Sequence, residues 1–175
     1  TRIESSAASD VYKRQLEPIV TVRSQMSDQE LTEAEVVVVV DQWSVEVGRQ
    51  LKQFAESGGL VIALPSAEAS SDALAKIVGD DSWKLSEAEG REFALLGDLD
   101  FEHPVLEPFA RARIRDFTKI RFWKHRNLAL SEEKKDLTRI LATFDGESPA
   151  IIERRVGEGS VSVSYTHLTL PTTRY

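Results

Sequence analysis

The feature that most constrains the fold is a run of five valines, Val36–Val40, which ends at Asp41. Consecutive β-branched residues without polar alternation are typical of a strand buried on both faces of a sheet. Apolar residues then recur at helical spacing over 44–57, Gly58-Gly59 ends that helix, and a second apolar run, 60–64, stops at Pro65. Strand, helix and strand in this order predict a parallel βαβ unit.

The rest of the chain predicts a single domain whose second half consists mostly of strands. A short strand at 18–22 and a helical turn at 28–33 should precede the valine run, and a helix over 73–78 should follow it. Further strands are expected at 83–85, 93–96, 117–125, 150–156 and 160–163, whereas 137–144 fits a strand or a short helix. The predicted fold class is therefore α/β, a Rossmann- or flavodoxin-like layered sheet with a strand-rich second half.

Composition limits the classes of function. The 175 residues suffice for one sizeable core, and the net charge of −7 disfavours nucleic acid as the main partner. The sequence has no cysteine, which excludes disulfides, thiolate metal sites and a cysteine nucleophile. No apolar run approaches the length of a membrane span, so no membrane insertion by this segment is predicted.

The two ends of the chain differ in pattern from their neighbours. The strings TRIESSAASDVYKRQ (1–15) and SVSYTHLTLPTTRY (162–175) resemble translated adapter or assembly artefacts. On this interpretation 1–15 and 162–175 are non-native, and 16–161 is one α/β domain truncated at both ends. The alternative is that both ends are ordinary frayed termini.

Two longer passages carry a resemblance to a known family. LTEAEVVVVVDQ and LKQFAESGGLVIALP resemble the class I glutamine amidotransferase-like fold. FEHPVLEPFARARIRDFTKIRFWKHRNL and TRILATFDGESPAIIERRVGEGSV are similar to the amidotransferase-like segment of bacterial envelope proteins that carry a BatA-type anchor and a von Willebrand factor A domain. The resemblance covers about 35–161. It implies a non-catalytic domain of a membrane-anchored protein, on the extracytoplasmic side of the cell envelope.

No catalytic constellation is visible in the sequence. A class I amidotransferase needs a nucleophilic cysteine with a histidine and an acid, and this chain has neither a cysteine nor a G-x-S-x-G serine elbow. Ser44 and Ser66 follow strands, where helix caps or turns are the expected roles. His103 and His125 have no metal-ligand spacing, and no phosphate-binding loop is present. We therefore predict no catalytic residue, no metal and no cofactor.

One candidate ligand site lies where the first two core strands end. Asp41 ends the valine run and Pro65-Ser66 ends the next strand, and open α/β sheets bind ligands at the carboxyl ends of their strands. We expect Asp41, Pro65, Ser66 and His103 to form this site. The alternative for Asp41 is a residue of a helix N-terminal turn, which the helix dipole favours.

A second candidate is a basic tract that interrupts an acidic chain. It could pair with acidic turns or a protein partner, with anionic lipid or polysaccharide, or with nucleic acid through interleaved aromatic residues. The candidate partner-binding residues are Arg113, Arg115, Lys119, Arg121, Lys124 and Arg126.

The function expected from these observations is a non-catalytic interaction or scaffold domain, with protein partners or neighbouring domains of the same chain. The alternative is a small-molecule-binding or hydrolytic α/β domain that uses the strand ends near Asp41 and Ser66.

Overall fold

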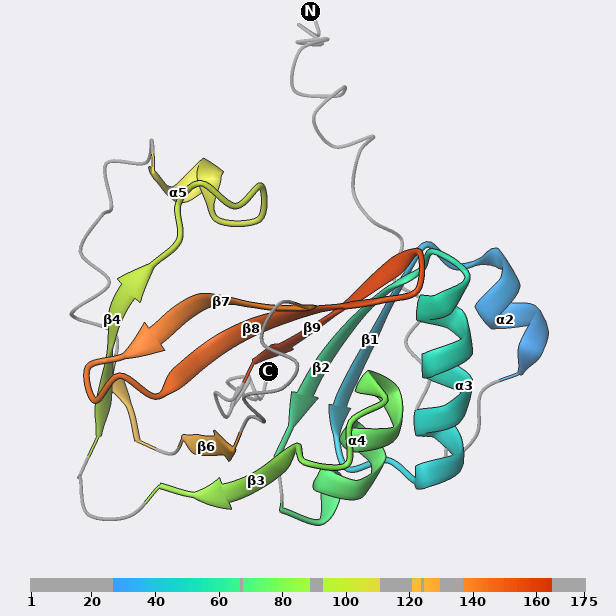
Figure 1. The fold of residues 1–175 in the computed structure, drawn as a ribbon, viewed down its shortest axis with the longest axis horizontal. Helices are drawn as coiled ribbons and strands as arrows, with labels where there is room; N and C mark the ends of the chain where they lie inside the picture. Colours follow the sequence, from blue (N-terminus) through green and yellow to red (C-terminus); the bar gives the residue numbers. More distant parts are fainter. Residues whose placement is uncertain are drawn as a thin grey trace, which may run out of the picture.

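The computed structural model describes residues 27–66, 68–88, 93–110, 121–123, 125–129 and 137–164 (Figure 1). The predicted strand at 18–22 lies outside these residues. The helices are α2 (Asp28–Glu33), α3 (Val45–Glu56), α4 (Ser71–Val78) and α5 (Glu107–Ala110), with a 3-10 turn at Glu68–Ser70. The strands are β1 (Val36–Asp41), β2 (Leu60–Pro65), β3 (Lys84–Glu87), β4 (Ala94–Leu99), β5 (Arg121–Phe122), β6 (Arg126–Ala129), β7 (Thr138–Phe144), β8 (Pro149–Val156) and β9 (Gly159–Ser164).

The predicted βαβ unit is confirmed. β1 and β2 pair in parallel along their whole length, from Val36 beside Leu60 to Asp41 beside Pro65, and α3 connects them. Ser44 caps α3, since its Oγ accepts a hydrogen bond of 3.3 Å from the backbone N–H of Val47. The sequence of residues 137–144 fits either a strand or a short helix. In the structure Thr138–Phe144 is a strand.

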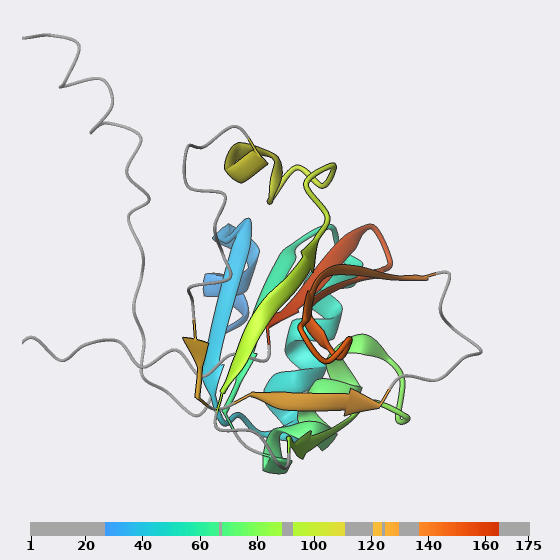
Figure 2. The same cartoon turned by 90° about the vertical axis from the view of Figure 1, so that its left-hand side faces the viewer.

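The described strands form a mixed sheet of seven strands in the order β1-β2-β9-β8-β7-β4-β5, and a small sheet of β3 and β6. β1, β2 and β9 are parallel to one another, and every later pairing in the large sheet is antiparallel. The sheet curls strongly from β1 to β4, so that it has the shape of half a barrel (Figures 1 and 2).

The predicted Rossmann- or flavodoxin-like layering is wrong. The main core lies between α3, α4 and one face of β2, β9 and β8, where Leu51, Val61 and Val161 have no exposed surface. A layered α/β fold needs helices on both faces of a mostly parallel sheet. Here the parallel part contains three strands, and antiparallel strands complete the sheet by curling round.

The valine run is also not buried on both faces. Val37 and Val39 pack against the main core, whereas Val36, Val38 and Val40 are 48%, 55% and 58% exposed. Side chains alternate between the two faces of a strand, and α2, α3 and α4 all contribute to the core on the face of Val37. A run of identical apolar residues hides that alternation in the sequence.

The last described strand incorporates the start of the segment predicted to be non-native. Val163 is fully buried and pairs with Ala63 of β2 and Ile152 of β8. Residues 1–15 and 165–175 lie outside the described residues, so the predicted domain boundaries at 16 and 161 stay a prediction.

Candidate functional site

The carboxyl end of β1 has an unusual backbone conformation. Asp41 has a φ of 72°, in the left-handed region that residues other than glycine rarely adopt, at a cost of about 1–3 kcal/mol. Three hydrogen bonds hold it there. The Ser66 N–H and the Ser70 hydroxyl donate to the Asp41 carbonyl, at 3.3 and 3.1 Å, and the Ser66 hydroxyl donates to Asp41 Oδ1.

An arginine from the other sheet continues this network. Arg126 begins β6, and its Nη2 donates a hydrogen bond to the Ser66 carbonyl. The same nitrogen lies 3.7 Å from Glu87 Oε1, and only 16% of the Arg126 side chain is exposed. Because β6 pairs with β3, with Arg126 beside Glu87, the small sheet holds the guanidinium against the end of β2.

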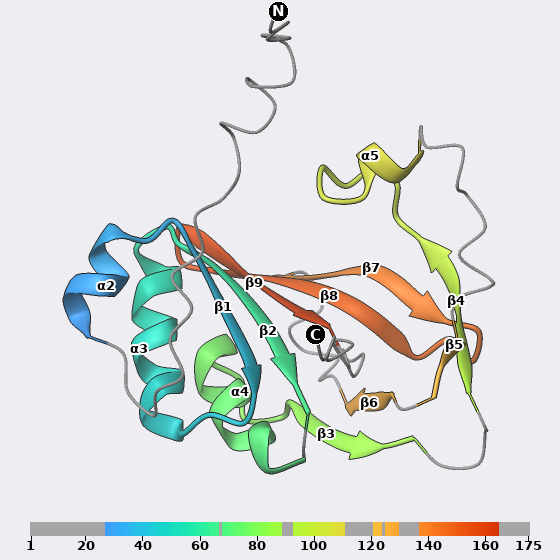
Figure 3. The same ribbon diagram turned by 180° about the vertical axis from the view of Figure 1, so that it is seen from behind.

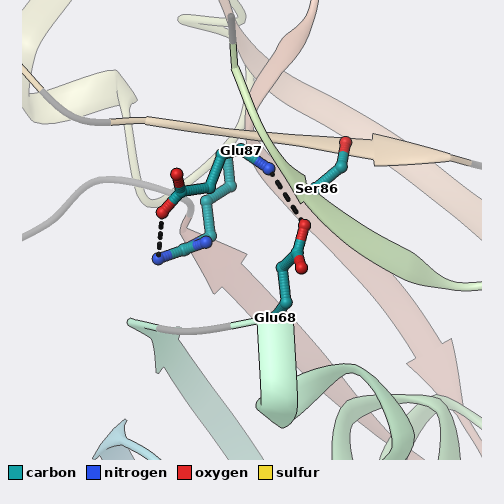
Figure 4. A pocket seen from close by; sticks show the side chains of 4 residues that line it. Glu68, Ser86 and Glu87 are labelled. Carbon is teal, nitrogen blue, oxygen red and sulfur yellow. Dashed lines mark hydrogen bonds and ion pairs between the residues drawn. The ribbon is translucent and has the colours of Figure 1, made fainter.

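Glu87 and Arg126 also border a cleft of about 430 Å³. The residues that line it are Glu68, Ser86, Glu87 and Arg126. The Glu87 N–H donates to Glu68 Oε1 at 3.3 Å, which joins the 3-10 turn to β3 across the cleft (Figure 4). Two carboxylates and one guanidinium line it, and the guanidinium is shared between the Ser66 carbonyl and Glu87. The cleft therefore offers mainly acceptors, which suit ligands that carry N–H donors or positive charge.

Three of the four predicted ligand-site residues lie close together in the structure. Asp41, Pro65 and Ser66 meet at one corner of the sheet, and Arg126 joins them there from the basic tract. None of the four predicted ligand-site residues, His103 included, is among the residues that line the cleft. Its Nε2 lies 3.0 Å from Glu153 Oε2 in β8, and its Nδ1 accepts a hydrogen bond of 3.3 Å from the Val105 N–H. His103 thus orders the turn between β4 and α5.

The basic tract is only partly covered by the described residues. Arg113, Arg115, Lys119 and Lys124 lie outside them. Arg121 is exposed, and its guanidinium carbon lies 4.8 Å above the centre of the Phe93 ring. Arg126 is the member that belongs to the cleft.

Four residues of the site were not predicted from the sequence. Glu68 and Ser70 follow β2 within five residues of Pro65, so proximity to a strand end was an available signal. Ser70 is the N-cap residue of α4, but its side chain makes no cap hydrogen bond and donates to the Asp41 carbonyl instead. Ser86 and Glu87 come from β3, whose position under the cleft depends on its pairing with β6. No sequence pattern marks that pairing.

The part of the chain that the structure describes contains neither a metal-binding cluster nor an activated serine nucleophile. There, no three histidine or acidic side chains are grouped as a metal site would require. The hydroxyls of Ser66 and Ser70 both donate to Asp41, and no described histidine lines the cleft.

None of the described helices has the length and hydropathy to cross a membrane.

Comparisons with known proteins support the fold alone. No family model matches the chain, and no curated protein matches it. It is similar to cytoplasmic protein STM3548 from Salmonella typhimurium, with a TM-score of 0.57, 13% identity and coverage of 84% of this chain and 65% of that one. It is similar to the N-terminal domain of mmIFT52, with a TM-score of 0.52, 10% identity and coverage of 93% and 78%.

A third similar structure is the exo-β-1,4-mannosidase Op5Man5 from Opitutaceae bacterium strain TAV5, with a TM-score of 0.50 and 17% identity. The match covers 77% of this chain and 21% of the mannosidase, so the chain spans about a fifth of that enzyme's length. At these identities a shared fold carries no statement about activity.

These findings correct the predicted family. None of the three similar structures is an amidotransferase-like domain or a BatA- or von Willebrand factor A-associated protein. The resemblance of 35–161 to that family is therefore wrong. The first two of the passages that carry it, a valine strand followed by Gly-Gly and an apolar strand, are shared by many folds that contain a βαβ unit.

Proposed function

We propose that this chain is a non-catalytic interaction domain that binds a protein segment with basic side chains at the cleft beside β2. The observation that carries the proposal is the arrangement at the rim of the cleft. Glu68 and the 77% exposed Glu87 present two carboxylates against one guanidinium, that of Arg126, which lies 3.7 Å from Glu87 and also donates to the Ser66 carbonyl. The net charge of −7 adds long-range attraction for a basic partner.

The alternative, a hydrolytic domain, has less support. A serine nucleophile needs a neighbouring base that removes its proton. The Ser66 hydroxyl donates to the Asp41 carboxylate, and no described histidine lines the neighbouring cleft to act as that base. The oxygen atoms of this corner instead maintain the left-handed turn at Asp41.

Binding can be tested with a synthetic oligolysine peptide as the probe. The double variant Glu68→Gln/Glu87→Gln should bind it about fivefold or more weakly, because two exposed charge pairs contribute about 1–2 kcal/mol together. The effect should shrink at high salt, where exposed charges are screened. Isothermal titration at two salt concentrations measures both quantities.

The matched control is Glu46→Gln/Glu56→Gln, which removes the same charge from exposed positions on α3. This control should bind the peptide as the unmodified chain does, within about twofold. Equal weakening by both double variants would assign the binding to net charge and contradict a role for the cleft.

Catalysis has its own test. The purified chain should hydrolyse p-nitrophenyl acetate and release ammonia from glutamine no faster than buffer, because no activated nucleophile stands at the strand ends. Ser66→Ala should leave both rates unchanged. Turnover above background that disappears in Ser66→Ala would replace the interaction domain by an enzyme.

A further inference from the structure

A second cleft lies between the helices α3 and α4. Its volume is about 340 Å³, which is within the range of small-molecule sites. The residues that line it are Arg49, Lys52, Ala75, Lys76, Gly79 and Asp81. Three positive side chains and one carboxylate give this lining a charge of +2, although the chain as a whole carries −7. The cleft is therefore a basic site on an acidic protein.

The close crossing of the two helices brings cations from both of them together. α3 and α4 lie side by side on one face of the sheet (Figures 1 and 3). A Cβ atom at Gly48 of α3 would lie 2.5 Å from the Ala73 carbonyl oxygen of α4, so the two backbones are in contact there. Arg49 follows this crossing, and Lys52 lies one helical turn later on the same side of α3. A Cβ atom at Gly79 would lie 3.5 Å from Lys52 Nζ, which places that ammonium beside the end of α4.

Each of the three cations has an acidic partner at the surface. Arg49 Nη1 lies 2.5 Å from Glu46 Oε2, Lys52 Nζ lies 3.6 Å from Glu56 Oε1, and Lys76 Nζ lies 2.7 Å from Asp81 Oδ1. All six side chains are at least 40% exposed, and exposed ion pairs of this kind contribute little to stability. An incoming anion can therefore take the place of these carboxylates at a small cost.

The chemistry of the lining selects the class of anion. The planar guanidinium of Arg49 can bind two oxygens of one phosphate group, and the lysine ammonium groups add compact charges. A phosphate group carries more charge and more acceptor oxygens than a carboxylate, so it can engage cations of both helices at once. The residues that line the cleft include no aromatic ring on which a nucleic-acid base could stack. The lining thus suits a small phosphorylated molecule.

We propose that the cleft between α3 and α4 binds a small phosphorylated molecule through Arg49, Lys52 and Lys76. This site shares no residue with the cleft that Glu68 and Glu87 line, so it is independent of the binding proposed there. Lys76 also lies in the last turn of α4, where a cation compensates the helix dipole. That role would require no ligand and no contribution from α3.

Isothermal titration of the full chain with inorganic pyrophosphate at low salt tests the site. The unmodified chain should bind one pyrophosphate with a dissociation constant of about 1 mM or lower. The double variant Lys52→Gln/Lys76→Gln removes one cation from each helix and should bind about tenfold more weakly. The matched control is Lys84→Gln/Arg155→Gln, at exposed positions in β3 and β8. It removes the same charge and should change the affinity by no more than about twofold.

Asp81→Asn tests the site in the opposite direction. It removes the carboxylate from the lining and releases Lys76, so pyrophosphate should bind about threefold more tightly. Asp98→Asn removes the same charge from an exposed position in β4 and should strengthen binding by less than about 1.5-fold. If the double lysine variant does not fold, the comparison of these two aspartate variants decides.

Three results would overturn the proposal. The first is the absence of saturable binding up to about 10 mM pyrophosphate, since that limit excludes a useful affinity. The second is an equal change of affinity in a cleft variant and its control, which would assign binding to net charge. The third is tight binding of a single-stranded oligonucleotide that pyrophosphate does not displace, because the cations would then belong to a nucleic-acid surface.

Discussion

Val61→Asp is expected to prevent the chain from folding. Val61 is the second residue of β2, has no exposed surface and pairs with Val37 on one side and Val161 on the other. An isolated carboxylate in such a position costs several kcal/mol, which is comparable with the 5–15 kcal/mol that stabilises a typical domain. Circular dichroism and solubility after expression measure the result.

Val38→Asp is the matched control for this variant. The sequence pattern predicts the same collapse for both positions, because it places Val38 inside the sheet. In the structure Val38 is 55% exposed, so its replacement should cost about 1 kcal/mol or less and lower the thermal midpoint by roughly 2–4 °C at most. A folded Val61→Asp together with an unfolded Val38→Asp would show that the two faces are assigned the wrong way round.

Gly159→Ala should be the second most damaging change. A Cβ atom at Gly159 would lie 2.5 Å from the Ala55 carbonyl oxygen and would also contact the carbonyl oxygen of Gly59. Both obstacles are backbone, so neither can rotate away. The expected loss is about 3 kcal/mol, which corresponds to a midpoint lower by roughly 6–12 °C for a domain of this size. Differential scanning calorimetry measures this shift.

Gly146→Ala provides the comparison within the same chain. Gly146 lies in the turn between β7 and β8, and a Cβ atom there would meet nothing within 4 Å. Its replacement should change the stability by no more than about 0.5 kcal/mol. If both alanine variants lost stability equally, the close approach of β9 to the end of α3 would not be the cause.

The sequence alone determined the local elements. The valine run, the helical spacing after it and the Gly-Gly at its end correctly predict β1, α3 and β2. These signals are local, since they depend on β-propensity, on 3.6-residue periodicity and on glycine at a helix end. The rule that ligands bind at strand carboxyl ends also brought Asp41 and Ser66 together correctly, because parallel neighbours end at the same edge.

Only the tertiary structure decided what each element contacts. Arg126 reaches Ser66 from sixty residues away because β6 pairs with β3, and no local pattern encodes that pairing. In the sequence Arg154 is one of several charged residues of β8. In the structure it is buried, and its Nη2 lies 3.4 Å from Asp80 Oδ2. Long-range pairs of this kind depend on how strands are ordered, which local propensity leaves open.

The faces of the sheet were decided in the same way. Five valines in succession are equally compatible with a strand buried on both faces and with a strand buried on one face, because every position is apolar. The choice depends on where the helices lie, and α2, α3 and α4 all contribute to the core on the side of Val37 and Val39. The local backbone thus followed from residue preferences, whereas burial followed from which elements meet across the chain.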